Sequence, residues 1–177
     1  MSDARGKEPS GACASQEKLL EGRHFPAKEH EKLKSLLQEG LVEAFRQEAG
    51  EAYTLSGYVV EGNRIGRTLG YPTANLSMDG LHLPRFGVYA VKVEVMDGPH
   101  AGLRDGVASL GVRPMFGENA PNLEVHVFDF SGDLYGAHLS VALVDFLRGE
   151  EKFDSVEALI SQMDADSARA RKILANA

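Results

Sequence analysis

The chain of 177 residues contains one cysteine, no tryptophan and no long hydrophobic run. Because Cys13 has no second cysteine to pair with, the sequence excludes a secreted scaffold held by internal disulfides. No apolar segment approaches the roughly 18 residues of a membrane-spanning helix. Residues 1–7 also lack the apolar core of a signal peptide. We therefore expect a cytoplasmic protein with no membrane partner.

Basic residues are scarce as well. The chain has 19 Lys and Arg against 26 Asp and Glu, a formal net charge of −7, and the parts before and after Tyr53 are both acidic. Proteins that bind nucleic acids usually carry a basic patch, and those that bind single strands add aromatic side chains to it. The composition therefore argues against a nucleic-acid partner. A hydrophobic content of 43% suits a chain that buries a core.

Patterning divides the chain into three parts. Residues 1–26 are predicted to be a flexible tail, because small and charged residues there follow no apolar period. Residues 27–52 are predicted to be a helical extension, in which apolar residues recur at intervals of three and four. Gly40 indicates either two short helices or one kinked helix. The apolar stripe consists of Leu33, Leu36, Leu37, Leu41, Ala44 and Phe45.

Residues 53–177 change to short segments with a period of two, separated by turn residues. The strand candidates are 56–61, which is rich in Val and Tyr, 105–110, which is flanked by glycine, and the alternating segments 89–95, 123–128 and 139–143. No helical pattern lies between them, which favours antiparallel pairing, and a closed barrel would leave no exposed edge. A C-terminal helix follows, for which Asp154 and Glu157 are the predicted capping box. The fold class is therefore mainly β, with helices at both ends.

The segment 62–75 is the most unusual part of the sequence. Three glycines spaced by four residues let the backbone approach a ligand and present N–H groups to phosphate oxygens. A proline then extends the chain, so that a threonine and an asparagine two residues apart share one face and offer oxygen ligands of the kind Mg²⁺ prefers. On spacing alone, an ordinary glycine-rich hairpin turn is the favoured interpretation. The residues concerned are Gly62, Gly66, Gly70, Thr73 and Asn75.

Glu124 is a second candidate, in the alternating segment 123–128. His126, Phe128 and Phe130 are expected on its face of the strand. Partial burial raises the pKa of a carboxyl group, which suits a general base. On spacing alone, a surface glutamate is the favoured interpretation. For His126 we favour space-filling over a role in orienting Glu124.

The third candidate is the segment 146–153, which links the last strand to the C-terminal helix. Arg148 and Phe153 could clamp a flat ligand or a phosphate. A solvated, charged connector explains the same residues at least as well. The histidines show no metal-ligand spacing, and no nucleophile motif of a hydrolase is present.

Together these stretches resemble the riboflavin kinase family, including the kinase module at the C-terminus of bacterial bifunctional FAD synthetases. The similarity runs from about Tyr53 to Leu174. Its most specific part is the run Gly-Arg-x-Leu-Gly-Tyr-Pro-Thr-Ala-Asn at 66–75, followed later by Leu-Glu-Val-His at 123–126. Further matching stretches are 83–84, 87–90, 106–111, 113–114, 129–130, 134–136, 147–148 and 152–153.

The resemblance implies a six-stranded antiparallel Greek-key barrel with a C-terminal helix. It implies transfer of the γ-phosphate of ATP to the 5′-hydroxyl of riboflavin, which gives FMN and ADP. The alternative is a non-catalytic flavin-binding or regulatory module on the same barrel. By position, the resemblance implies that the nucleotide is bound by Gly62, Gly66, Arg67, Gly70, Thr73 and Asn75. It implies that Thr73 and Asn75 hold Mg²⁺ or another divalent cation. It also implies that Glu124 is the catalytic base and that Arg148 and Phe153 contact the flavin.

Two positions depart from the bifunctional enzymes. Ser109 stands where those enzymes usually have Asn, and Met115 where they usually have Thr. We expect these differences to change ligand affinity more than reaction class. Nothing in the chain resembles the adenylyltransferase domain, so we do not expect FAD synthesis by this chain alone. A separate FMN adenylyltransferase is the expected protein partner.

Overall fold

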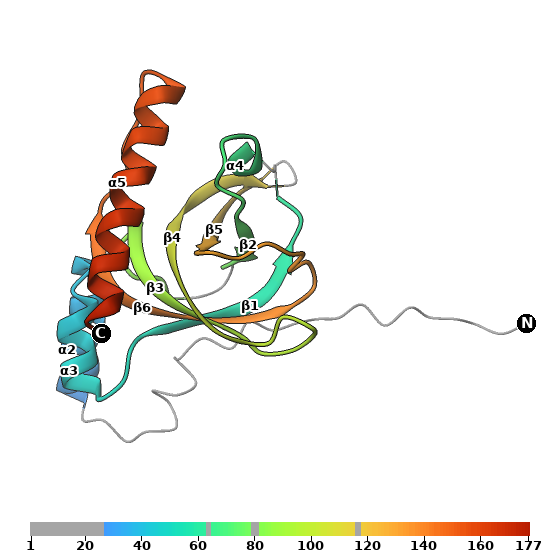
Figure 1. Cartoon of the computed structure of the whole chain (residues 1–177). Helices are drawn as coiled ribbons and strands as arrows, with labels where there is room; N and C mark the ends of the chain where they lie inside the picture. The colour runs from blue at the N-terminus through green and yellow to red at the C-terminus, as the bar shows by residue number, and fades with distance from the viewer. Residues whose placement is uncertain (1–26, 63–64, 79–81, 116–117) are drawn as a thin grey trace, which may run out of the picture.

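The computed structural model describes residues 27–62, 65–78, 82–115 and 118–177. The predicted flexible tail, Cys13 included, lies outside these residues. The strands are β1 Thr54–Val60, β2 Ala74–Ser77, β3 Gly87–Val95, β4 Gly102–Met115, β5 Glu118–Val127 and β6 His138–Arg148. The helices are α2 Ala27–Glu39, α3 Val42–Ala49, α4 Ile65–Thr68 and α5 Val156–Ala175 (Figure 1).

The six strands close into one barrel in the order β1-β2-β5-β4-β3-β6, and every neighbouring pair is antiparallel. β3, β4 and β5 are consecutive in sequence and in space. β2 lies beside β5 although β3 and β4 come between them in the sequence, and β6 lies beside β3 although β4 and β5 come between them. These two arrangements are Greek-key connections. The predicted fold class is therefore confirmed. The alternating pattern did not predict β2 as a strand, because four residues are too few to show a period.

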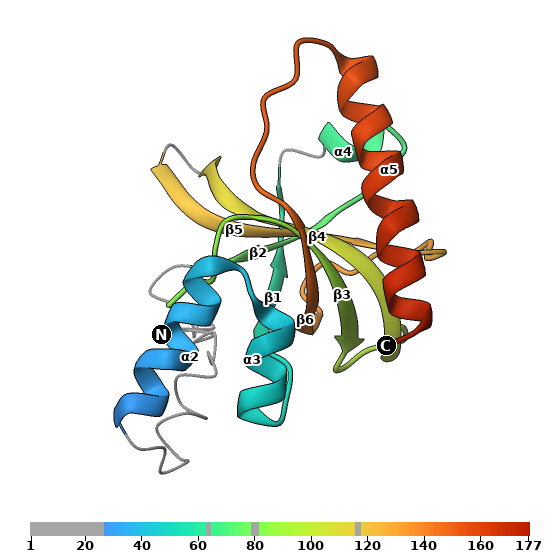
Figure 2. The same cartoon turned by 90° about the vertical axis from the view of Figure 1, so that its left-hand side faces the viewer.

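Alternation places one set of side chains inside the barrel, where the core includes the fully buried Leu55, Leu76, Leu110, Leu123 and Leu139. The opposite face of β3, β4 and β6 contacts α5. The C-terminal half of α5 buries Ala170 and Leu174 in a second apolar cluster there. The N-terminal half of the helix extends past the barrel toward α4 (Figures 1 and 2).

The N-cap of helix α5 lies one residue later than predicted. Ser155 is the N-cap: it has an extended backbone, and its hydroxyl accepts a hydrogen bond from the backbone N–H of Ala158 at 3.1 Å. Asp154 is therefore not the capping residue. A capping box needs Glu or Gln three residues after the cap. The residue in that position is Ala158, so no such box forms.

Helices α2 and α3 pack against the end of the barrel opposite α4 (Figure 2). Gly40 separates them with φ of +78°, a backbone conformation that favours glycine. Leu37 and Phe45 are almost fully buried, and the Phe45 ring meets the Tyr53 ring edge-on at 5.4 Å. Leu41, assigned to the apolar stripe, is instead 47% exposed. A new helix begins at Val42, which takes the buried position.

Candidate functional site

A row of polar side chains crosses the outer face of the barrel where β2, β5 and β4 lie side by side. Asn75 pairs with Glu124 across β2 and β5, and Glu124 pairs with Ser109 across β5 and β4. Directly opposite residues in antiparallel strands place their Cβ atoms about 4.5–5.5 Å apart. Their neighbours along the strands, including Leu123 and Leu110, are buried in the core. The row therefore points outward from a rigid wall.

Asn75 is anchored below the surface of this wall. Its side chain is 7% exposed, and its Oδ1 accepts a hydrogen bond from Nδ2 of the buried Asn122 at 3.1 Å. A Cβ at Gly62 would lie 2.3 Å from Nδ2 of Asn75, which leaves no room for any larger residue there. Gly62 thus lets the loop after β1 lie directly against the Asn75 amide.

The segment between β1 and β2 folds over this row through the short helix α4. The carbonyl oxygen of Gly66 accepts hydrogen bonds from the N–H groups of Leu69 and Tyr71, at 3.1 and 2.7 Å. A Cβ at Gly66 would lie 2.3 Å from the Tyr71 carbonyl oxygen. Gly70 ends the turn with φ of +84°. The repeated glycines therefore serve close backbone packing and a turn, both of which require the absence of a side chain.

Tyr71 connects this loop to helix α5. Its hydroxyl donates a hydrogen bond to Asp164. Burial, together with that hydrogen bond, raises the pKa of Tyr71 above its ordinary value. The hydroxyl consequently stays protonated, and remains a donor, at neutral pH.

The helix-side pocket lies between the polar row, the loop and α5, with a volume of about 450 Å³. That size suits a small-molecule site. Helix α5 contributes Leu159, Met163, Asp166 and Ser167 to its wall. The barrel, the loop before β2 and the connection after β6 supply further lining residues, among them Gly62, Gly66, Tyr71, Thr73, Asn75, Ser109, Asn122, Glu124, His126, Arg148, Glu150, Glu151 and Phe153.

Arg148 closes one side of the helix-side pocket and is tied to α5. Its Nε lies 3.0 Å and its Nη2 2.9 Å from Oδ2 of Asp166, which forms a forked ion pair. The guanidinium also lies over the Phe153 ring, 5.6 Å from its centroid. Gln162 donates a further hydrogen bond to Asp166 at 2.9 Å. The charge of Arg148 is therefore balanced within the protein, while Arg148 and Phe153 still face the pocket.

Several carboxylates line the helix-side pocket, and their settings differ. Asp166 is occupied by Arg148 and Gln162. Glu150 and Glu151 are exposed on the connection after β6. Glu124 alone among these lies on a barrel strand, half-buried and opposite Asn75. Of these carboxylates, Glu124 is the one whose backbone is held by strand pairs on both sides.

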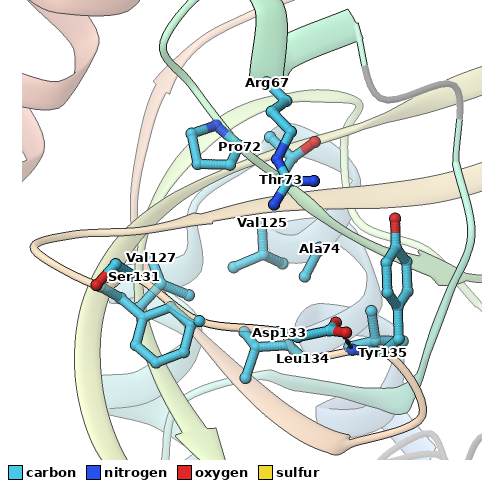
Figure 3. A pocket seen from close by; sticks show the side chains of 13 residues that line it. Arg67, Pro72, Thr73, Ala74, Val125, Val127, Ser131, Asp133, Leu134 and Tyr135 are labelled. Carbon is cyan, nitrogen blue, oxygen red and sulfur yellow. Dashed lines mark hydrogen bonds between the residues drawn. The ribbon is translucent and has the colours of Figure 1, made fainter.

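The barrel-end pocket lies on the other side of β2 and has a volume of about 550 Å³. Ala74, Val125 and Val127 form its apolar floor, Arg67 and Thr73 lie along one side, and Asp133, Leu134 and Tyr135 lie along the opposite side (Figure 3). The other lining residues are Val59, Pro72, Phe130, Ser131 and Gly132. Thr73 lines both pockets, and among the residues that the structure describes it is the one that they share.

The expectation that Phe130 shares the face of Glu124 is wrong. β5 ends at Val127, and Asp129 has a positive φ of 53° that turns the chain. Phe130 therefore lines the barrel-end pocket, while Phe128 stays on the outer face, where its ring lies 5.9 Å from that of His126.

The structure brings together most of the site residues expected from the sequence. The helix-side pocket contains Gly62, Gly66, Thr73, Asn75, Glu124, Arg148 and Phe153. Arg67 lines the barrel-end pocket together with Thr73, and Gly70 lines neither. Among the described residues, no cluster of three or more His, Cys, Asp or Glu side chains could hold a metal. No helix in that part of the chain is long and apolar enough to span a membrane.

Sequence reasoning missed Tyr71, Asn122, Asp166 and Ser167, which line the helix-side pocket, and Asp164, which accepts the hydrogen bond of Tyr71. Tyr71 lies within the glycine motif, and its hydroxyl could have indicated a hydrogen-bonding role for this side chain. Asp166 could have been found from the helical period, because it follows the pocket-lining Met163 by three residues and Leu159 by seven, on the same face of the helix. Asn122 is two residues from Glu124, on the same face of the strand.

Two adjoining pockets of ligand size that meet at Thr73, with Glu124 lining one of them, define a small-molecule binding site on the barrel. Comparison with known proteins agrees. The riboflavin kinase (flavokinase) family model matches residues 49–174. The bifunctional riboflavin kinase/FMN adenylyltransferase of Bacillus subtilis is 33% identical over 168 residues, which cover 93% of this chain and 51% of that protein.

Two solved structures share the fold. A Streptococcus pneumoniae protein described as a macrolide-efflux protein has a TM-score of 0.71 at 36% identity, covering 79% of this chain and 45% of the other. A riboflavin kinase from Trypanosoma brucei has a TM-score of 0.50 at 23% identity, covering 68% of this chain and 78% of the other. The chain spans about half the length of the curated relatives it matches. It belongs to the riboflavin kinase family.

Proposed function

We propose that this chain transfers the γ-phosphate of ATP to the 5′-hydroxyl of riboflavin, giving FMN and ADP. The observation that carries the proposal is the shared position of Thr73 between two pockets of ligand size. Phosphoryl transfer depends mainly on positioning and charge neutralisation. A nucleotide on one side of Thr73 and an alcohol on the other meet that requirement.

Riboflavin is proposed to occupy the helix-side pocket. The flat ring would lie toward Arg148 and Phe153, and the sugar-alcohol tail would extend along the wall toward Glu124. ATP is proposed to occupy the barrel-end pocket, with Arg67 beside its phosphates and the γ-phosphate at Thr73. The apolar floor of Ala74 and its neighbours suits a purine base, and Arg67 suits phosphate oxygens.

Glu124 is proposed as the general base. Its carboxylate takes the proton from the 5′-hydroxyl while the oxygen attacks the γ-phosphorus. The new O–P bond forms as the bond to the bridging β–γ oxygen breaks, and ADP leaves. Asn75 and Ser109, directly opposite Glu124 on the neighbouring strands, fix its backbone on both sides.

Thr73 and Asn75 offer the oxygen donors proposed to hold Mg²⁺, or another divalent cation, with the phosphates. Hydroxyl and amide oxygens suit this cation, and Oδ1 of Asn75 is held in place by Asn122. The bound cation would neutralise phosphate charge. Gly62 and Gly66, which line the helix-side pocket together with Thr73, and Gly70, which ends the turn, are proposed to keep the loop backbone close to the γ-phosphate of the nucleotide, where the two pockets meet.

The reaction is proposed to take place in the cytoplasm, where ATP is abundant and a lone cysteine stays reduced. A separate FMN adenylyltransferase would convert FMN further. The decisive experiment incubates the protein with riboflavin, ATP and Mg²⁺ and separates flavins by chromatography. FMN formation that requires all three components supports the proposal. Tight riboflavin binding without FMN would instead support a non-catalytic flavin-binding module.

A further inference from the structure

The chain just before β2 is held by a side chain instead of by the sheet. The ladder between β2 and β5 ends at the pair Ala74 and Val125. One residue further along β5, Nδ1 of His126 lies 2.9 Å from the carbonyl oxygen of Pro72. A carbonyl oxygen can only accept, so this ring nitrogen is the donor. His126 thereby continues the attachment of the chain to β5 beyond the last strand pair.

The neighbouring Tyr71 is held from the other side. Its ring meets the His126 ring edge-on, with centroids 5.0 Å apart, and its hydroxyl donates to Asp164 on α5. The dipeptide Tyr71–Pro72 is therefore fixed between β5 and α5. The next residue is Thr73, which lines both pockets. Any movement of the Pro72 carbonyl moves the backbone that carries the Thr73 hydroxyl.

We infer that His126 is a positioning residue: the hydrogen bond from its Nδ1 to Pro72 sets the place of the Thr73 hydroxyl between the two ligands. This inference rests on the proposed function. It replaces the space-filling role favoured from the sequence, in which only the ring contacts with Tyr71 and Phe128 would matter.

Two substitutions separate these roles. His126→Phe keeps an aromatic ring but removes the donor. His126→Asn removes the ring but keeps an N–H in nearly the position of Nδ1. Loss of one hydrogen bond changes an equilibrium by roughly 2- to 12-fold, and misplacement near reacting atoms costs up to about 100-fold.

We expect His126→Phe to lower kcat/KM for Mg·ATP by about 10-fold or more; because His126 also lines the helix-side pocket, the KM for riboflavin is measured separately. His126→Asn should restore kcat/KM to within about threefold of wild type. A second readout, independent of turnover, is calorimetric binding of a non-hydrolysable Mg·ATP analogue, which His126→Phe should weaken and His126→Asn should not. His138→Phe is the matched control: His138 also lies on a strand and stacks on a tyrosine, Tyr58, but lines neither pocket.

Circular dichroism and thermal unfolding establish that each variant is folded. If His126→Phe does not fold, His126→Leu, which also lacks a donor, replaces it. The inference is overturned if the variant without a donor retains wild-type kinetics and nucleotide binding, or if His126→Asn loses as much as His126→Phe. If the wild-type protein forms no FMN, the proposed function fails, and nucleotide binding alone decides the role of His126.

Discussion

Replacing Glu124 by glutamine tests the chemistry most directly. Glutamine has the same shape but cannot accept the proton of the attacking hydroxyl. General-base catalysis contributes about 10²- to 10⁴-fold, so the barrier to phosphoryl transfer should rise by about 3–5 kcal/mol at roughly 1.4 kcal/mol per tenfold. Glu124 is half-buried on the outer face of β5 and outside the core. The free energy of unfolding should therefore change by less than about 1 kcal/mol.

The assay measures FMN formation under saturating riboflavin and Mg·ATP, so that kcat is separated from binding. We expect kcat to fall by the factor given above while both KM values stay within about threefold, because the substitution removes an interaction with the transition state. The matched control is Glu94→Gln, an exposed glutamate on β3 that lines neither pocket.

Turnover of Glu124→Gln within threefold of wild type would remove Glu124 from the mechanism. Equal losses in Glu124→Gln and Glu94→Gln would show that the effect comes from net charge instead of position. A fall in kcat accompanied by a comparable loss of stability would also contradict the reasoning, because the polar row lies outside the barrel core.

The remaining predictions concern the attachment of α5 to the barrel. Asp166→Ala removes the forked partner of Arg148, whose side chain is 17% exposed. The free energy of unfolding in urea should fall by about 3 kcal/mol, and riboflavin should bind more weakly. An unchanged stability would contradict the proposed attachment of α5 through Arg148 and Asp166. The hydrogen bond from Arg171 lowers the pKa of the exposed Asp129, so its contribution to stability is complete at neutral pH and is lost as the pH falls below about 4. The difference in urea stability between wild type and Asp129→Asn should therefore be larger at pH 7 than at pH 3, and a difference independent of pH would show that this ion pair contributes nothing.

The fold and the family could be predicted from the sequence because both depend on local patterns. Alternation in the segments 89–95, 123–128 and 139–143 predicts half-buried strands, and several short strands without intervening helices favour antiparallel pairing in a closed sheet. The same alternation determines that Glu124 lies on the face opposite Leu123 and Val125. The runs 66–75 and 123–126 were specific enough to suggest the family that the comparisons established.

Other features are decided only when the barrel closes. The four residues of β2 show no period of their own, and their place between β1 and β5 comes from pairing with both. The bond between His126 and Pro72 joins residues 54 positions apart, and Arg148 meets Asp166 only because α5 folds back on the barrel. The division of the site into two pockets on either side of Thr73 likewise depends on one face of β2 pointing into the barrel and the other toward α5. A sequence pattern determines which face of a strand is apolar, but the contacts between distant segments depend on how those faces pack in three dimensions.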